Sequence, residues 1–86
     1  MGQHFLTQES IAERLAQSLN TEGCDAIVEV GPGKGILTRF LLKQPLPVIP
    51  VELDRDLIPG LEKQFSNTAL RIVQGDVLRV RFDELF

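Results

Sequence analysis

The 86-residue chain lacks several features that would assign it to particular classes of protein. Its one cysteine, Cys24, can form no internal disulfide and has no partners at metal-ligand spacing, so we expect a small residue leading into the first strand and no metal site. No apolar run approaches the roughly 20 residues that cross a bilayer, and the N-terminus lacks the basic-then-apolar order of a signal peptide. These absences predict a cytoplasmic protein without membrane contacts.

Basic residues are scarce as well. Nine lysines and arginines stand against twelve aspartates and glutamates, which gives a net charge of −3. This balance provides no general attraction for nucleic acid, so contact with RNA would need a local patch or groups outside this segment. Aromatic residues are few (6%) and charged residues make up 24% of the chain, as in small globular domains.

Apolar spacing predicts six elements in the order α-β-α-β-α-β. Ile11, Leu15 and Leu19 recur at four-residue steps, which indicates the first helix. The predicted elements are a helix capped by Thr7 and ending near 20–23, a strand over 26–30, a helix from Ile36 to the prolines at 45 and 47, a strand over 48–53, a helix capped by Asp54 or Asp56, and a strand over 70–73. Strands separated by helices imply a parallel sheet with right-handed crossovers.

This α/β order is half of a doubly wound sheet. The second half normally completes the crevice in which ligand and substrate meet, so we expect a fragment of a longer enzyme, with an open edge on its first strand. Open edges pair with other chains, so the fragment is expected to self-associate. Pro50 falls inside the second strand, which we expect to be central, and its missing N–H predicts either a bulge or a shorter strand.

A glycine-rich turn joins the first strand to the second helix. Gly31, Gly33 and Gly35 alternate there, which lets the backbone approach a ligand beside the unpaired N–H groups of the helix. A dinucleotide fingerprint would need glycine at position 36, where the chain has Ile36, so a nicotinamide-dependent dehydrogenase is disfavoured. The G-x-G-x-G form after an acidic residue resembles the S-adenosylmethionine loop of Rossmann-like methyltransferases, and an ordinary strand-to-helix turn is the alternative.

Acidic side chains lie at or near the C-terminal end of each predicted strand. Glu52 closes the second strand, where a carboxylate can accept both hydroxyls of a ribose, and Asp76 follows the third, where it can accept the amino group of adenine. Glu29 can meet a cofactor's amino group or support the loop. The alternatives are a cap or surface carboxylate for Glu52 and a turn residue for Asp76. Because parallel strands end at one edge of a sheet, the loop, Glu52 and Asp76 together favour a nucleoside site.

Four segments together resemble the small-subunit ribosomal RNA adenine dimethyltransferase family, and the similarity runs from end to end. They are residues 2–6 (Gly-Gln-His-Phe-Leu), 28–38, 51–54 and 74–76. The resemblance implies a Rossmann-like, S-adenosyl-L-methionine-dependent methyltransferase fold, of which residues 1–86 would be the N-terminal part. In that family the cofactor is held by the residues that match His4, Leu6, Gly31, Glu52 and Asp76.

The resemblance also implies a reaction. Enzymes of this family transfer methyl groups from S-adenosylmethionine to N6 of two adjacent adenosines near the 3′ end of small-subunit (16S) ribosomal RNA, so the implied partner is that RNA or the 30S particle. Their acceptors for the adenine amine come from an Asn-Leu-Pro-Tyr-type motif, and a C-terminal helical domain helps to engage the RNA. Neither lies within these 86 residues, so both are expected beyond Phe86. This predicts a cofactor-binding segment that has no catalytic residue and is inactive alone.

Two other functions stay open. A macrolide-resistance methylase acting on large-subunit ribosomal RNA shares the folding plan, although Pro32 and the Leu37-Thr38 pair favour the small-subunit type. The other is a noncatalytic module that binds S-adenosylmethionine. An Asn-Pro-Tyr motif beyond Phe86 in the reading frame would decide between enzyme and module.

Overall fold

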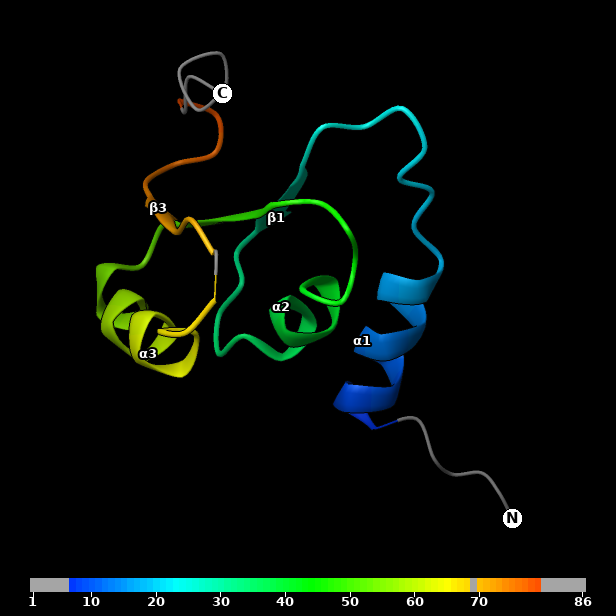
Figure 1. Cartoon of the computed structure of the whole chain (residues 1–86). Coiled ribbons are helices and arrows are strands. Elements are labelled where there is room, and N and C mark those ends of the chain that lie inside the picture. The colour runs from blue at the N-terminus through cyan, green and yellow to red at the C-terminus, as the bar shows by residue number, and fades with distance from the viewer. Residues whose placement is uncertain (1–6, 69, 80–86) are drawn as a thin grey trace.

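The structure, a computed structural model, describes residues 7–68 and 70–79 and alternates helices with strands (Figure 1). The elements are α1 (Gln8–Gln17), β1 (Ile27–Val30), α2 (Ile36–Leu41), β2 (Val48–Glu52), the 3-10 helix η1 (Arg55–Leu57), α3 (Ile58–Gln64) and β3 (Val73–Gln74). This order confirms the predicted α/β fold. Within the described ranges, no helix has the length and apolar character needed to cross a membrane.

The three strands form one parallel sheet in the order β1-β2-β3, so β2 is central as predicted. β1 pairs with β2 over four residues, whereas β3 pairs with it over only two. All five residues of β2 are buried. Among the described strands, β1 lies at one edge of the sheet, and its Val28 and Val30 side chains are 39% and 63% exposed. This open edge is the one expected for half of a doubly wound sheet.

Pro50 lies in the middle of β2 without the bulge that was one of the two expectations, because the pairing with β1 is continuous. The carbonyl groups at positions 48 and 52 accept hydrogen bonds on the β3 side, from Arg71 N (3.3 Å) and Gly75 N (2.9 Å), whereas those at 47 and 51 accept on the β1 side. Even-numbered residues of β2 therefore face β3, and Pro50 has no N–H to donate there. The ladder to β3 accordingly begins at Val73 rather than at the predicted Leu70. β2 itself ends one residue earlier than predicted, at position 52.

α1 packs against α2 and buries two short side chains, Ala12 and Ala16. Ala16 joins Leu41 and Val48 in the core cluster. Ile11 and Leu15, whose spacing predicted the helix, instead remain 43% and 54% exposed. The distance between packed helices depends on the side chains at their contact. Because the buried side chains of α1 are alanines, α1 and α2 can pack closely.

Local hydrogen bonds mark two element boundaries. α1 ends at Gln17, before the predicted 20–23, and the Ser18 hydroxyl that follows donates to the Leu15 carbonyl at 2.8 Å. Ahead of α3, Asp54 rather than Asp56 is the cap, since its carboxylate accepts from the Asp56 N–H at 2.9 Å where η1 begins.

Candidate functional site

The glycine loop leaves β1 at the C-terminal edge of the sheet. Gly31 N donates to the Val51 carbonyl at 2.9 Å, which carries the β1–β2 ladder one residue into the loop. Gly35 N donates to the Pro32 carbonyl at 2.9 Å and closes the turn from which α2 starts. Glycines 31, 33 and 35 all have positive φ, at 67°, 59° and 83°. The predicted strand-loop-helix arrangement is therefore confirmed.

Gly35 is the most constrained of these glycines. It occupies the N-cap position of α2 in the left-handed conformation, which side chains disfavour. A Cβ added there would lie 2.7 Å from Phe65 Cε2 and 3.0 Å from Gln64 Oε1 at the end of α3. The loop is therefore packed tightly against α3 at this position.

Glu52 closes β2 and binds the loop. Its side chain is buried, with 5% exposure. Oε1 accepts from Gly33 N at 2.9 Å, and Oε2 accepts from Asp54 N at 3.0 Å. Each carboxylate oxygen has two lone pairs, so both oxygens retain the capacity to accept another donor. Glu52 is neither a helix cap nor a surface carboxylate.

Asp76 follows β3 and stands half-buried in a turn. Its Oδ1 accepts from Leu78 N at 2.9 Å, and its carbonyl accepts from Arg79 N at 2.8 Å. Asp76 is therefore a turn residue. One oxygen of its carboxylate is used in this turn, which leaves acceptor capacity for a further donor.

Three of the five predicted site residues come together at one edge of the sheet. Gly31 N bonds the end of β2, and Gly75 N donates to the Glu52 carbonyl at 2.9 Å, so the segments that carry Gly31, Glu52 and Asp76 are neighbours.

The other sequence predictions for the site fall on residues that the structure does not describe. His4 and Leu6 lie outside the described ranges, and their assignment to the cofactor stays a prediction. Phe86 lies outside them as well, so the expectation that the acceptor motif follows this residue also stays a prediction.

Glu29 points from β1 toward α2. Its side chain is 6% exposed, and its Oε1 accepts a hydrogen bond from the Thr38 hydroxyl. Burial raises the pKa of Glu29 above its usual value, and the nearby charge of Glu52 raises it further, whereas the Thr38 hydrogen bond opposes both effects. The two roles expected for Glu29 were contact with a cofactor's amino group and support of the loop; the bond from Thr38 ties Glu29 to α2, the helix that directly follows the loop.

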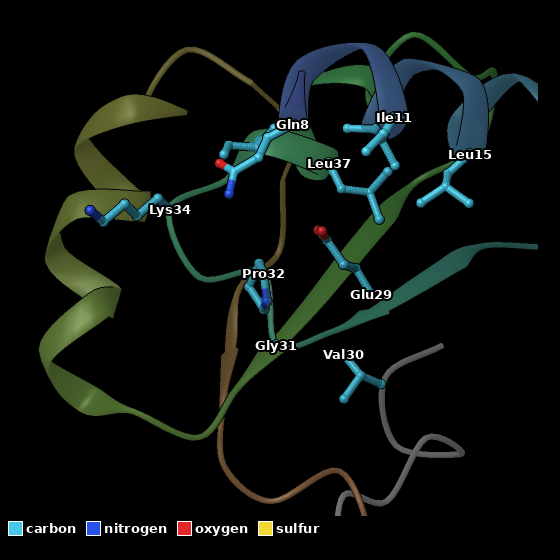
Figure 2. Close-up of a pocket in the computed structure, with 11 residues that line it drawn as sticks. Gln8, Ile11, Leu15, Glu29, Val30, Gly31, Pro32, Lys34 and Leu37 are labelled. Carbon is cyan, nitrogen blue, oxygen red and sulfur yellow. The ribbon is translucent and has the colours of Figure 1, made fainter. Parts of the chain in front are cut away.

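A cavity of about 350 Å³ lies beside Glu29, between α1, β1 and the glycine loop. Figure 2 shows the Glu29 carboxylate pointing toward Leu37, whereas Val30, its neighbour in the strand, points the other way. Ile11 and Leu15 of α1 form the apolar wall opposite the sheet. The side chains exposed on α1 therefore border a hollow next to the loop.

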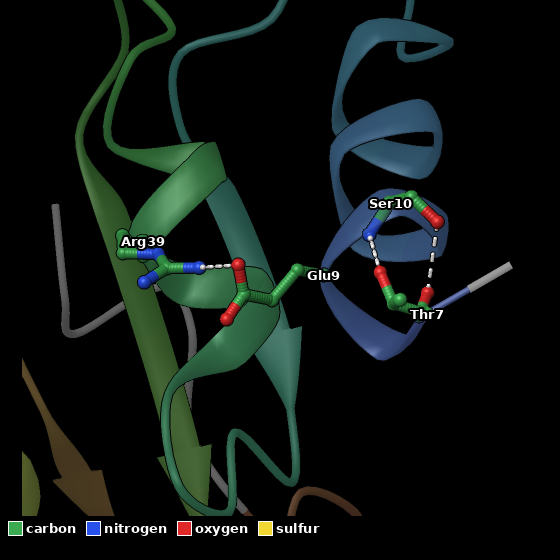
Figure 3. Close-up of polar contacts among 4 residues, drawn as sticks. All are labelled: Thr7, Glu9, Ser10 and Arg39. Atoms are coloured by element: carbon green, nitrogen blue, oxygen red, sulfur yellow. Dashed lines mark hydrogen bonds and ion pairs between the residues drawn. The ribbon is translucent and has the colours of Figure 1, made fainter. Parts of the chain in front are cut away.

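Polar contacts fix the start of α1 beside this cavity (Figure 3). Thr7 caps α1 as predicted, because its Oγ1 accepts from Ser10 N at 3.1 Å. Glu9, in the first turn, forms an ion pair of 3.3 Å with Arg39 of α2. Both charged side chains are exposed, so this ion pair contributes at most about 1 kcal/mol to the stability of the fold.

Sequence reasoning missed Thr38 as a member of the site. It is fully buried, at 0% exposure, on the face of α2 that also buries Leu41. The signal was present, because a hydroxyl on an apolar helix face needs a hydrogen-bond partner. The identity of that partner is a tertiary contact, which helical periodicity does not reveal.

The whole chain, residues 1–86, matches the family model described as ribosomal RNA adenine dimethylase. The chain belongs to this family. The match confirms the resemblance found in the sequence motifs.

Similarity to individual curated proteins agrees with this family assignment. The chain is 41% identical over 86 residues to the ribosomal RNA small subunit methyltransferase A of Porphyromonas gingivalis, covering 100% of the chain and 33% of that protein. It is 43% identical over 84 residues to the protein of the same name from Acidithiobacillus ferrooxidans, covering 98% of the chain and 32% of the relative. The chain thus spans about a third of the length of these relatives.

Solved structures share the fold. The glycopeptide N-methyltransferase MtfA complexed with S-adenosyl-L-methionine superposes with a TM-score of 0.70 at 22% identity, covering 87% of the chain and 35% of that protein. The N-terminal domain of EvdMO1 with S-adenosylhomocysteine bound gives 0.66 at 19% identity, covering 94% of the chain and 35% of that structure. This likeness confirms the predicted Rossmann-like methyltransferase fold.

Proposed function

We propose that the chain is the S-adenosyl-L-methionine-binding segment of an enzyme that dimethylates N6 of two adjacent adenosines in small-subunit ribosomal RNA. The observation that carries the proposal is Glu52, a buried carboxylate held against the glycine loop at the C-terminal edge of the sheet. A ribose presents two neighbouring hydroxyl donors, which a carboxylate with free lone pairs accepts. Membership of the ribosomal RNA adenine dimethylase family supports adenine as the target.

The cofactor would lie across the ends of all three strands. Glu52 would accept the ribose hydroxyls beyond its two backbone hydrogen bonds, and Asp76 would accept the amino group of adenine. The methionine end would reach the glycine loop at Gly31. The resemblance to the family adds His4 and Leu6 to this end of the site.

The acceptor half of the reaction needs groups beyond these. The adenine amine is conjugated with its ring and poorly nucleophilic, so it must be held in line with the sulfonium methyl group while acceptors bind its hydrogens. We propose that residues 1–86 form the cofactor-binding part and that the acceptor motif and the RNA-binding helical domain belong to a longer protein of the relatives' size. Its partner would be small-subunit RNA or the 30S particle in the cytoplasm. The names of the curated relatives favour this substrate over large-subunit RNA.

Cofactor binding tests the proposal. The chain is expected to bind S-adenosylhomocysteine in calorimetry, more weakly than a full-length enzyme, and not to bind NAD. Glu52→Ala removes two charge-assisted hydrogen bonds to ribose and should weaken binding by about 10- to 150-fold, or about 1.5 to 3 kcal/mol. Glu62→Ala, which removes an exposed glutamate of α3, is the matched control and should leave the affinity unchanged. Unchanged affinity in Glu52→Ala, or binding of NAD, would contradict the proposal.

We also propose that the isolated chain self-associates through β1. This strand lies at an edge of the described sheet and exposes apolar side chains, and such edges pair with other chains. Light scattering should show dimers or larger species, and Val30→Lys should shift them toward monomer. Leu78→Lys places the same charge at a 90% exposed position after β3 and should have no such effect. A strict monomer at high concentration would contradict the expectation.

A further inference from the structure

Two buried carboxylates hold the segment that runs from the glycine loop into α2, one near each end. Glu52 accepts from the Gly33 N–H within the loop at 2.9 Å, and Glu29 accepts from the Thr38 hydroxyl in α2. α2 has no side-chain cap, since Gly35 stands at its N-cap position. Two neighbouring strands, β1 and β2, therefore supply the side chains that fix residues 31–38.

We propose that Glu29 is a positioning residue for the cofactor site: through Thr38 it sets the orientation of α2 and, with it, the glycine loop. This inference rests on the proposed function, because it concerns how the same loop is presented to the cofactor. Glu29 acts here without touching the ligand. Its counterpart Glu52 holds the loop directly, whereas Glu29 holds the helix that follows.

Packing alone does not explain why a glutamate and a threonine occupy positions 29 and 38. Glu29 is 6% exposed and Thr38 is 0% exposed, so both polar groups have lost most of their contact with water. An apolar pair of similar volume would avoid this desolvation cost. A hydrogen bond, in contrast, is directional, so it fixes the distance and angle between β1 and α2.

The link does not require a charge on Glu29. Burial raises the pKa of this carboxyl group, and the charge of Glu52 acts in the same direction. A neutral carboxyl still accepts through its carbonyl oxygen, so the bond from Thr38 persists in either protonation state. Glu29→Gln is therefore a neutral replacement that keeps the acceptor and the length of the side chain.

The test compares S-adenosylhomocysteine affinity with stability in one set of variants of the 86-residue chain. Thr38→Val removes the donor at nearly constant volume, whereas Thr38→Ser keeps it. The double variant Glu29→Met with Thr38→Val replaces the polar pair by an apolar pair of similar size. Thr21→Val, in the turn before β1, is the matched control for the threonine change. Calorimetry gives the affinity, and urea unfolding of the same samples gives the stability.

We expect Thr38→Val and the double variant each to weaken binding by about tenfold, while Thr38→Ser, Glu29→Gln and Thr21→Val stay within about twofold of the unchanged chain. The double variant should nevertheless regain the urea midpoint of the unchanged chain, because its buried pair is apolar. If the double variant binds as tightly as the unchanged chain, Glu29 has only a packing role and the inference is wrong. If Glu29→Gln weakens binding as much as Thr38→Val, the carboxylate itself acts on the ligand rather than through the bond from Thr38, and the inference is also wrong. Failure of the unchanged chain to bind would instead overturn the proposed function.

Discussion

The isolated 86-residue chain is expected to transfer no methyl group to ribosomal RNA, even with saturating S-adenosylmethionine. Correct alignment of two reactants is worth about 7 to 11 kcal/mol of an activation barrier. The groups that we propose to align the adenine amine are not among these residues. The net charge of −3 also provides little attraction for phosphate, so the RNA would not accumulate at the protein surface.

Labelled methyl groups provide the measurement. Small-subunit particles that lack the methyl groups would be incubated with the chain or with the full-length ribosomal RNA small subunit methyltransferase A of Porphyromonas gingivalis, which is 41% identical over the shared region. Incorporation is expected with the relative and not with the chain. Substantial incorporation by the purified chain, lost in Asp76→Ala, would show that the catalytic groups lie within these 86 residues after all.

Gly35→Ala should destabilise the fold strongly. Its φ of +83° costs an alanine about 1 to 2 kcal/mol. The new Cβ would stand 2.7 Å from Phe65 Cε2, and relieving such an overlap in a packed region costs about 1 to 3 kcal/mol more. The expected loss is therefore about 2 to 5 kcal/mol in the free energy of unfolding, measured by urea denaturation.

Gly60→Ala is the control for this change. Gly60 lies within α3 without a positive φ, and an added Cβ would meet no atom within 4 Å. Alanine there should stabilise the chain by about 0.5 to 1 kcal/mol, because glycine is a poor residue in a helix interior. Equal stability of the Gly35→Ala variant and the unchanged chain would show that the loop can shift away from α3.

The sequence predicted the order of elements and the convergence of Gly31, Glu52 and Asp76, because these depend on local spacing and on the geometry shared by all parallel sheets. It did not predict that Ile11 would stay exposed while the alanines of α1 were buried, since periodicity identifies a stripe without its partner. The bond from Thr38 to Glu29 was also missed, because it joins two elements through side chains.

Boundaries departed from prediction where a single residue changed the local hydrogen bonding. α1 ends just before Ser18, whose hydroxyl bonds back to the last turn, and Pro50 leaves the ladder to β3 short. Both residues were visible in the sequence, yet the effect of Pro50 depends on which neighbouring strand its missing N–H would face. That direction follows from the register, which the sequence pattern alone leaves undetermined.

The short β3 ladder makes the Asp76 side of the proposed site less stable than the Glu52 side. β3 joins the sheet through two register pairs, against four for β1, so its edge should open at a lower free energy than the rest of the sheet. Asp76 follows this strand, whereas Glu52 belongs to the buried central one. A nucleoside that contacted both residues would bind only when β3 is paired with β2, and its binding would stabilise that paired state by mass action. Substitutions that fray β3 would then reduce ligand affinity from a distance, without removing any contact to the ligand.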